Sequence, residues 1–588
     1  MPIHDSANAT NGHHARPKVL VPEKLSPDGL ALLRKTLDVD ERKGLSAEDL
    51  LGIISDYDAL IVRSETKVTA ALLAAGKKLK VVARAGVGVD NVDVGAATKL
   101  GIIVVNSPSG NIGAAAEHTI ALLLATARNV PEACASLEAG KWERSKLVGV
   151  EVKGKTLGVI GFGKVGISVA RLAIGLGMHV QALDPYASPA VASSHNVSLV
   201  SSLPDLLAVS DFLTIHTPLI ASTKGMISTK ELQGMKKGAR ILNVARGGMI
   251  NEAALLDALN SGHLAGAGID VWSTEPPEQD SAATKLIAHP KVVATPHLGA
   301  STVEAQENVS IDVCEQVLSI LRGDLPRSAV NAPLILPEEY KKLQPFVRLV
   351  EKMGSLYTQH YSKPRAHHSS TSTPPHQDTR TTFDLIYEGS LATLTNTTPL
   401  FAALIKGLTS AITSHAGTAV NIVNADLIAR DRGLVINEQH SRTPTTHTYS
   451  SLVTLIARPP HPSPSSPSTT TPPDQIITGY CSDAQIFISR LDRFATSFVP
   501  AGHLLICHNY DEPGKIGVVG GLLGREGVNI NSMAVAPVSG AGAGAGGEGE
   551  EKRGEALMIL GVDREVSEEV VGRLVREEGI WDVSVVGL

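Results

Sequence analysis

Six residues, Gly161-Phe162-Gly163-Lys164-Val165-Gly166, constrain the fold of this chain more than any others. They follow an apolar run, residues 155–160, that is typical of a buried strand, and residues 165–173 have the pattern of a helix. In such a unit the first glycine makes the tight turn, the second admits a pyrophosphate and the third lets helix and strand pack closely. The turn therefore predicts a dinucleotide-binding α/β domain; a purely structural glycine turn is the alternative. The predicted cofactor contacts here are Gly161, Gly163, Lys164, Val165 and Gly166.

An acidic residue follows at the distance that such a domain requires. Asp184 ends the next predicted strand, residues 179–183. A carboxylate at this position binds the ribose hydroxyls of the adenosine and repels a 2′-phosphate. The sequence therefore predicts NAD, rather than NADP, as the cofactor.

Three further motifs each contain one residue with acid, base or anion-binding chemistry. Arg246 lies in the motif Asn-Val-Ala-Arg-Gly-Gly, Glu275 in Asp-Val-Trp-Ser-Thr-Glu-Pro and His297 in Thr-Pro-His-Leu-Gly. Removal of hydride from a 2-hydroxy acid requires three groups: a cation that binds the substrate carboxylate, a proton acceptor, and a protein carboxylate beside that acceptor. Singly, each has an ordinary alternative: a helix-capping cation, a turn acid and a loop histidine.

With these motifs the chain resembles the D-2-hydroxyacid dehydrogenase family, and within it the long-form phosphoglycerate dehydrogenases, over about residues 58–335 and more weakly to the C-terminus. The resemblance implies NAD-dependent oxidation of 3-phospho-D-glycerate, the first step of L-serine biosynthesis. His297 would take the proton from the C2 hydroxyl, Glu275 would hold the imidazole and stabilise its cation, and Arg246 would grip the carboxylate. Two alternatives remain: another 2-hydroxyacid dehydrogenase, such as a glyoxylate or hydroxypyruvate reductase or a D-lactate dehydrogenase, and a non-enzymatic NAD sensor like the dehydrogenase-fold corepressors.

The resemblance also implies further contacts to cofactor and substrate. Arg63 and Arg84 lie near the ends of predicted strands and would suit a second anion, the 3-phosphate. Arg144 matches a basic position that in the family can reach across a dimer; a solvated surface cation is the alternative. The remaining predicted cofactor residues are Thr217, Pro218, Val244, Ala245, Asp270, Gly299 and Ala300, with Asp270 at the carboxamide, and the remaining substrate residues are Ser64, Gly86 and Asn111.

The expected architecture is α/β, with two doubly wound lobes, one flavodoxin-like and one Rossmann-like. The resemblance implies a split substrate domain, residues 18–108 and 296–335, around an NAD-binding domain, residues 109–295. Its connecting helix, about residues 112–128, is apolar on most sides, as either a buried dimer helix or an interior helix would be. An α+β intervening domain, residues 336–500, is expected next. Low composition complexity predicts a disordered tail, residues 1–17, and disordered insertions at 362–382, 458–474 and 539–551.

Residues 501–588 resemble an ACT domain, a ferredoxin-like module that binds amino acids. The loop 509–514 and the turn 527–529 are expected to converge on one small polar ligand, L-serine, as a feedback effector. Asn509, Asp511 and Asn529 are the predicted contacts, and Asn509 stands where serine-sensitive members carry His or Tyr. An ACT domain used only for assembly is the alternative.

Composition bounds the remaining possibilities. A net charge of -6 gives no reason to expect a nucleic-acid or membrane partner. The four cysteines have no metal or disulfide spacing, and the polar N-terminal stretch does not resemble a signal peptide. We therefore expect no metal, a cytoplasmic location and, from the resemblance, a homodimer or homotetramer. The cysteines are Cys134, Cys314, Cys481 and Cys507.

Overall fold

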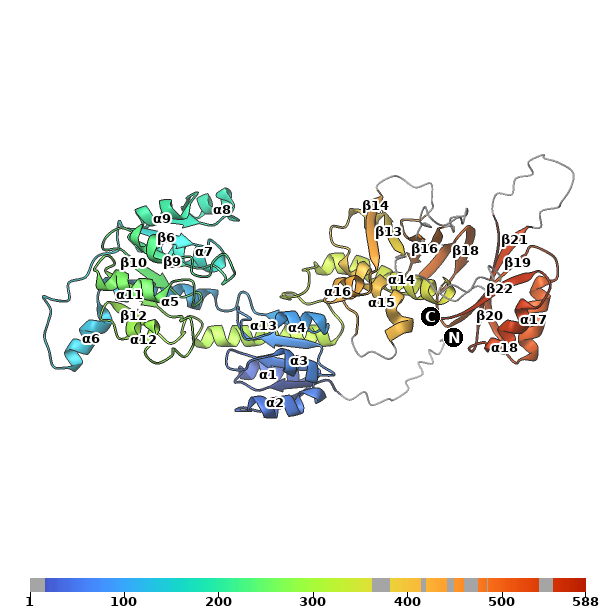
Figure 1. Cartoon of the computed structure of the whole chain (residues 1–588), viewed down its shortest axis with the longest axis horizontal. Helices are drawn as coiled ribbons and strands as arrows, with labels where there is room; N and C mark the ends of the chain where they lie inside the picture. The colour runs from blue at the N-terminus through green and yellow to red at the C-terminus, as the bar shows by residue number, and fades with distance from the viewer. Residues whose placement is uncertain are drawn as a thin grey trace, which may run out of the picture. The chain divides into compact units, whose positions relative to one another are not determined.

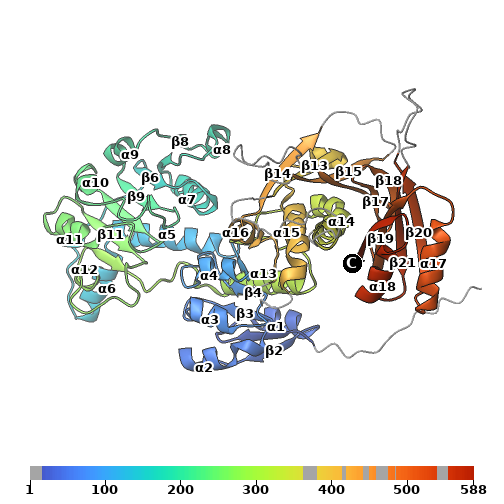
Figure 2. The same ribbon diagram turned by 45° about the vertical axis from the view of Figure 1, so that its right-hand side comes forward.

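The structure is a computed structural model that describes residues 16–361, 381–413, 419–441, 449–458, 474–483, 485–538 and 554–588 (Figures 1 and 2). It divides the chain into two compact units. The first contains residues up to Arg322, except for 69–75 and 93–104, and these two segments belong with residues 323–588 in the second. The predicted tail and the three predicted insertions lie almost wholly outside the described residues.

The first lobe is built on a five-stranded sheet of order β2-β1-β3-β4-β5. Its described pairs β1–β2, β1–β3 and β3–β4 are parallel, and β1 and β3 are apolar runs that are almost fully buried, as a sheet covered on both faces requires. This is the flavodoxin-like strand order that the sequence predicts. The long helix α13 returns from the second lobe to pack on α1 and β4 (Figure 2). The elements are β1 (Lys18–Val21), α1 (Pro27–Arg34), β2 (Asp38–Glu41), α2 (Ala47–Ile53), η1 (Ile54–Asp56), β3 (Ala59–Val62), β4 (Val81–Arg84), β5 (Ile103–Asn106) and α13 (Val303–Leu321). Two helices of this part of the chain, α3 (Ala70–Ala75) and α4 (Val94–Lys99), lie in the segments that are grouped with the second unit.

The second lobe contains a seven-stranded sheet of order β12-β11-β10-β9-β6-β7-β8. The order runs outward in two directions from β6 and β9, which is the Rossmann arrangement, with its ligand crevice at the carboxyl ends of those two strands. Helix α5 packs on α7, β10 and β11, so its apolar sides are used inside this lobe. The elements are α5 (Ile112–Ala127), α6 (Val130–Glu138), β6 (Thr156–Ile160), α7 (Lys164–Gly175), β7 (His179–Leu183), α8 (Pro189–Ser194), β8 (Ser198–Leu199), α9 (Leu203–Val209), β9 (Phe212–Ile215), α10 (Thr229–Gln233), β10 (Arg240–Asn243), α11 (Glu252–Asn260), β11 (Gly266–Ile269), α12 (Ala282–Ile287) and β12 (Val292–Ala294).

The second unit begins with two helices that cross at glycines. A Cβ atom on Gly407 of α15 would lie 2.2 Å from the carbonyl oxygen of Glu351, and one on Gly354 of α14 would lie 2.8 Å from that of Leu404. These helices cover a six-stranded sheet of order β14-β13-β15-β16-β17-β18, in which only the β13–β14 pair is parallel. The elements are α14 (Pro337–Tyr361), β13 (Thr382–Gly389), η2 (Ser390–Thr393), α15 (Thr398–Thr413), α16 (Ala425–Asp431), β14 (Val435–Ser441), β15 (Ser451–Arg458), β16 (Gln475–Ser482), β17 (Gln485–Leu491) and β18 (Phe494–Phe498).

The C-terminal residues form a βαββαβ module with strand order β20-β21-β19-β22, which is the predicted ferredoxin-like arrangement. Helices α17 and α18 cover one face of its sheet (Figure 1). The other face, including Leu504, Ile506 and Leu557, shares one hydrophobic core with α14 and the six-stranded sheet. No helix among the described residues has both the length and the apolarity to cross a membrane. The elements are β19 (His503–Tyr510), α17 (Lys515–Arg525), β20 (Ile530–Pro537), β21 (Glu555–Val562), α18 (Glu568–Val575) and β22 (Ile580–Gly587).

Candidate active site

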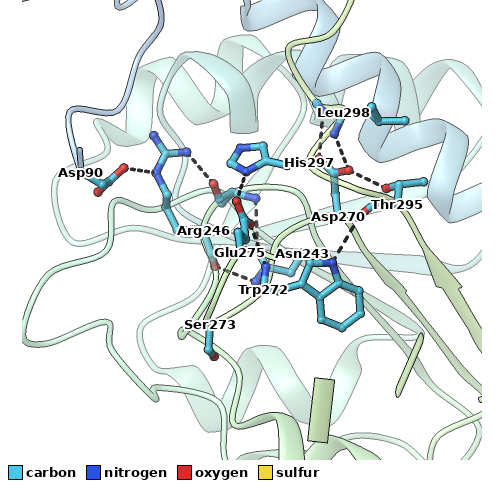
Figure 3. A network of polar contacts seen from close by, with 12 residues as sticks. Asp90, Asn243, Arg246, Asp270, Trp272, Ser273, Glu275, Thr295, His297 and Leu298 are labelled. Atoms are coloured by element: carbon cyan, nitrogen blue, oxygen red, sulfur yellow. Dashed lines mark hydrogen bonds and ion pairs between the residues drawn. The ribbon is translucent and has the colours of Figure 1, made fainter. Parts of the chain in front are cut away.

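A histidine and a glutamate form the centre of the site. His297 Nδ1 lies 2.7 Å from Glu275 Oε2, and the other carboxylate oxygen accepts a hydrogen bond from the backbone N–H of Trp272 at 3.0 Å (Figure 3). Burial alone would raise the pKa of Glu275, but the hydrogen bonds from His297 and Trp272 outweigh it and hold that pKa below its usual value. An ionised Glu275 accepts the proton on Nδ1, so Nε2 of His297 is left as a proton acceptor.

The turn that carries His297 is held by Asp270. The backbone N–H of His297 donates to the carbonyl oxygen of Asp270 at 2.8 Å, and the N–H groups of Leu298 and Gly299 donate to its carboxylate at 2.7 and 2.8 Å. Burial would raise the pKa of this fully buried carboxyl, but hydrogen bonds from His118, Thr295 and the two backbone groups lower it. His297 has φ +58°, a left-handed conformation that few residues other than glycine adopt. Asp270 therefore fixes an unfavourable turn that orients the ring of His297.

Arg246 reaches the site from the turn after β10. The side-chain amide of Asn243 donates to the carbonyl of Arg246 at 2.8 Å and shapes this turn. The guanidinium donates from Nε to Asp90 at 3.0 Å and from Nη1 to the carbonyl of Ala245 at 2.7 Å. Asp90 is two-thirds exposed, so this ion pair leaves Arg246 available to an incoming carboxylate.

A second cation, Arg84, lies beside Arg246. Burial, followed by the charge of Arg246, lowers the pKa of Arg84 to about 10, so it stays a cation at neutral pH. Its Nε atom is buried and has no hydrogen-bond partner among the described residues. Gly86, with φ +153°, gives the room for this guanidinium, because a Cβ there would lie 1.8 Å from Arg84 Nη1. A buried, incompletely bonded cation next to another cation suits a multiply charged anion.

The backbone of the loop that carries Arg63 and Ser64 is held by hydrogen bonds to a buried glutamate. Glu23 accepts hydrogen bonds from the backbone N–H groups of Arg63, Glu65 and Thr66 at 2.9, 3.2 and 3.0 Å. Asn91 donates to the carbonyl oxygens of Arg63 and Thr66. Sequence reasoning missed Glu23; the available signal was an acid two residues after the end of the apolar strand β1.

The cofactor turn has the geometry that the glycine spacing predicts. Gly161 has φ +93°, a Cβ on Gly166 would lie 2.2 Å from the carbonyl of Gly161, and a Cβ on Gly163 would meet no protein atom within 4 Å. The open space at Gly163, in front of the first turn of α7, fits a pyrophosphate. Asp184 accepts hydrogen bonds from the N–H groups of Phe162 and Tyr186, both at 2.8 Å, and keeps lone pairs for ribose hydroxyls. These residues fit NAD.

The other predicted cofactor residues surround the same crevice. They follow β9, β10 and β12 at the carboxyl edge of the sheet, where Thr217 is partly exposed and Lys164 Nζ donates to Ser109 Oγ at 2.9 Å. Asn111 is the N-cap residue of α5, and its Oδ1 atom is buried without a hydrogen-bond partner among the described residues. This oxygen could therefore accept a hydrogen bond from a bound ligand. The members of this group are Thr217, Pro218, Val244, Ala245, Gly299 and Ala300.

Arg144 stands apart from these residues. It is exposed on the segment after α6, where it lines a cavity of about 240 Å³ with Leu137 and Trp142. A second, largely apolar cavity of about 390 Å³ adjoins Glu275 and His297 and is also lined by Trp272 and Ile287. The pair His297–Glu275 therefore has an apolar side.

The predicted effector residues do not converge within one chain. Along β21, the end of β19 pairs with Glu555, whereas the start of β20 pairs with Val562. Asp511 and Asn529 are therefore at opposite ends of the sheet, about 23 Å apart at about 3.3 Å per residue. Asn509 is buried, and its amide donates to the carbonyl of Tyr510 at 2.7 Å. The expectation of one converging site fails because α17 carries the chain back to the end at which β19 began.

Comparisons with known proteins show the class of protein to which this fold belongs. Residues 120–299 match the NAD-binding domain of D-isomer specific 2-hydroxyacid dehydrogenases, and residues 376–462 match the intervening domain of D-3-phosphoglycerate dehydrogenase. A solved structure of a putative D-isomer specific 2-hydroxyacid dehydrogenase from Polaromonas sp. JS6 66 aligns with a TM-score of 0.50 at 27% identity, covering 54% of this chain and 99% of that one. The fold is thus that of an NAD-dependent 2-hydroxyacid dehydrogenase.

Relatives that match nearly the whole chain narrow this class. The chain is 42% identical over 562 residues to D-3-phosphoglycerate dehydrogenase 2, chloroplastic, of Arabidopsis thaliana, covering 95% of this chain and 85% of that protein. It is 38% identical over 572 residues to D-3-phosphoglycerate dehydrogenase of Archaeoglobus fulgidus, with 97% and 100% covered. The enzyme of that name from Bacillus subtilis is 37% identical over 573 residues, with 97% and 99% covered. The chain belongs to the D-3-phosphoglycerate dehydrogenase family.

Proposed function

We propose that this chain oxidises 3-phospho-D-glycerate to 3-phosphohydroxypyruvate with NAD, as the first step of L-serine biosynthesis. The observation that carries this proposal is the hydrogen-bonded pair His297–Glu275 in one site with two adjacent cations, Arg84 and Arg246. The pair supplies a proton acceptor, and the cations suit a substrate with an anion at each end. NAD, when bound, supplies the hydride acceptor.

The chain's own residues have separate roles in this reaction. Arg246 holds the substrate carboxylate, in exchange for its exposed partner Asp90. His297 Nε2 takes the hydroxyl proton while the hydride leaves C2, so that the C2–O bond becomes a carbonyl. The positive charge that develops on the imidazole is stabilised by the Glu275 carboxylate at Nδ1. Arg84, with Arg63 on the loop held by Glu23, binds the phosphate.

The decisive experiment compares NADH production from 3-phosphoglycerate by the parent protein and by His297→Ala. Loss of a general base typically costs about 10²–10⁴-fold in rate, and NAD affinity should be unchanged because the cofactor turn lies elsewhere. A parent protein without turnover on this substrate, or an active His297→Ala variant, would refute the proposal.

Substrate class is tested at Arg84. Arg84→Ala should impair turnover of 3-phosphoglycerate far more than turnover of a phosphate-free 2-hydroxy acid, because removing the partner of a buried anion costs about 2–5 kcal/mol. Equal losses on both substrates would favour another 2-hydroxyacid dehydrogenase. Binding of NADH without turnover on any 2-hydroxy acid would favour the NAD-sensor alternative.

The active form proposed here is a homodimer or a larger homo-oligomer. Helix α6 has no buried residue, and three large apolar side chains near it are exposed: Leu137 by 58%, Trp142 by 82% and Val148 by 78%. Such a cluster on a monomer surface indicates a protein interface. A variant with Leu137→Asp and Val148→Asp should lower the mass measured by light scattering, whereas Leu51→Asp, an exposed position in the first lobe, should not.

L-serine is proposed as an effector that binds between two C-terminal modules. Because Asp511 and Asn529 lie at opposite ends of one sheet, a site that uses both needs Asp511 from one copy and Asn529 from another. Asp511→Ala and Asn529→Ala should each abolish serine inhibition and keep turnover. Mixed dimers of the two variants should regain inhibition, because they contain one site with both side chains intact.

A mixture that stays insensitive, while the parent protein is inhibited, would place the site within a single chain. If calorimetry detects no binding of serine to the parent protein at millimolar concentration, the C-terminal module serves only in assembly.

The compartment that we propose is the cytosol, in agreement with four free cysteines, although the Arabidopsis relatives are named chloroplastic.

A further inference from the structure

The chain passes between the two lobes of the first unit twice, and both passages reach the same carboxylate. The first passage leads from β5 into α5, which carries His118. The second leads from β12 into α13 and contains Thr295 and His297. Asp270, directly after β11, contacts residues of both passages.

The contacts of His118 show which of its ring nitrogens carries a proton. Thr295 Oγ1 donates its only hydrogen to Asp270 Oδ1 at 2.5 Å. His118 Nε2 lies 3.2 Å from the same carboxylate oxygen and 3.1 Å from Thr295 Oγ1. Both neighbours can only accept from the histidine, so Nε2 carries a proton and donates to both.

We infer that His118 is a positioning residue for the proton acceptor His297. It acts through Asp270, whose carboxylate receives the N–H groups of Leu298 and Gly299 and whose carbonyl receives that of His297. The inference rests on the proposed role of His297 as the base.

The burial of Asp270 makes the donor from His118 necessary. The Asp270 side chain has no exposed surface, and water cannot easily replace a lost donor. A carboxylate that lacks one donor must draw on Thr295 or on the backbone of the turn. His297, at φ +58°, keeps its conformation only while the surrounding bonds fix it. A shift of this turn moves the ring of His297 away from Glu275 and from the reacting hydroxyl.

The choice of histidine, rather than an apolar residue, on this side of α5 follows from the same geometry. Its ring is only 19% exposed, and its two acceptors belong to the end of β11 and the beginning of the second passage. A histidine that only filled space would not need two acceptors from these two elements. His118 therefore ties the helix of the first passage to the turn of the second.

The test compares His118→Leu with His118→Gln in the full-length protein. Leucine removes the donor, whereas the glutamine amide can place an N–H near the position of Nε2. We expect His118→Leu to lower kcat by about 10–100-fold, the usual effect of displacing a catalytic group by about 1 Å. His118→Gln should restore most of the rate.

His263→Leu is the matched control, because this partly buried histidine also donates one hydrogen bond, from Nε2 to the carbonyl of Leu232 at 3.0 Å, and that bond does not involve Asp270. It should change thermal stability and leave kcat as in the parent. Unchanged kcat in His118→Leu, or equal losses in both His118 variants together with a lower melting temperature, would overturn the inference. Failure of the proposed function is recognised separately, by a parent protein without turnover or by an active His297→Ala variant.

Discussion

Replacing Glu275 by glutamine tests how the site stabilises the proton that it removes. The substitution keeps one oxygen, which can accept from the backbone of Trp272, and removes both the charge and the acceptor that face His297 Nδ1. Two unit charges about 4 Å apart near a protein surface interact by about 4 kcal/mol. The exposed fractions of His297 and Glu275 are 42% and 37%, so solvent screening reduces this to about 2 kcal/mol. The loss of the charge alone lowers kcat by about 30-fold, and the loss of the acceptor for Nδ1 adds to it, so we expect a fall of at least about 30-fold.

The assay is NADH formation from 3-phosphoglycerate as a function of pH. Without the carboxylate the protonated imidazole is less stable, so the acidic limb of the kcat/KM profile should move to lower pH. Glu252→Gln is the matched control, because Glu252 accepts from the N–H of Ser273 at 2.8 Å in the same turn and does not touch His297. An unshifted limb with an unchanged rate in Glu275→Gln would show that this carboxylate only shapes the turn.

Three further predictions concern the cofactor, the pH dependence of stability and the packing of the second unit. Asp184→Ser should relax the preference for NAD over NADP, measured as the ratio of kcat/KM values, and a parent protein that uses both equally would contradict it. Burial lowers the pKa of His216 to about 4, so as the pH falls the unfolded state takes up a proton before the folded state does. The free energy of unfolding should therefore fall between about pH 6.5 and 4, and His216→Gln should make the melting temperature less dependent on pH in that range. Gly407→Ala should cost about 1–3 kcal/mol through overpacking against α14, whereas Gly572→Ala, which meets nothing within 4 Å, should not destabilise.

The sequence predicted those parts of the site whose residues are adjacent in the chain or belong to short motifs. The turn from Gly161 to Gly166 depends on steric rules that act over a few residues, and the structure has the close approach at Gly166 that these rules require. The hydrogen bond between His297 and Glu275, which are 22 residues apart, was also expected, but from the family resemblance and not from local chemistry.

The residues that sequence reasoning missed form hydrogen bonds with partners that are far away in the chain. Glu23 binds N–H groups some 40 residues later, and His118 reaches Asp270, 152 residues away. No periodicity marks such a pair, because the partner is a main-chain amide or a buried carboxylate that only the fold brings near. The prediction that the effector residues converge within one chain was wrong for a different reason, and βαβ geometry alone could have shown it. A strand that follows a crossover helix begins at the end of the sheet where the first strand began, so Asn529 lies far from Asp511.

The ion pair between Arg246 and Asp90 orients the guanidinium and joins the two lobes. Asp90 lies in the loop after β4, and Arg246 lies in the other lobe after β10. Because Asp90 is 66% exposed, the pair is worth at most about 1 kcal/mol, yet it holds the guanidinium where a carboxylate is to bind. In the proposed reaction a substrate carboxylate displaces Asp90 from Arg246 at little cost, and Arg84 remains for the phosphate. Under this proposal Asp90 occupies the place of the substrate carboxylate, and the same guanidinium joins the lobes before and after binding.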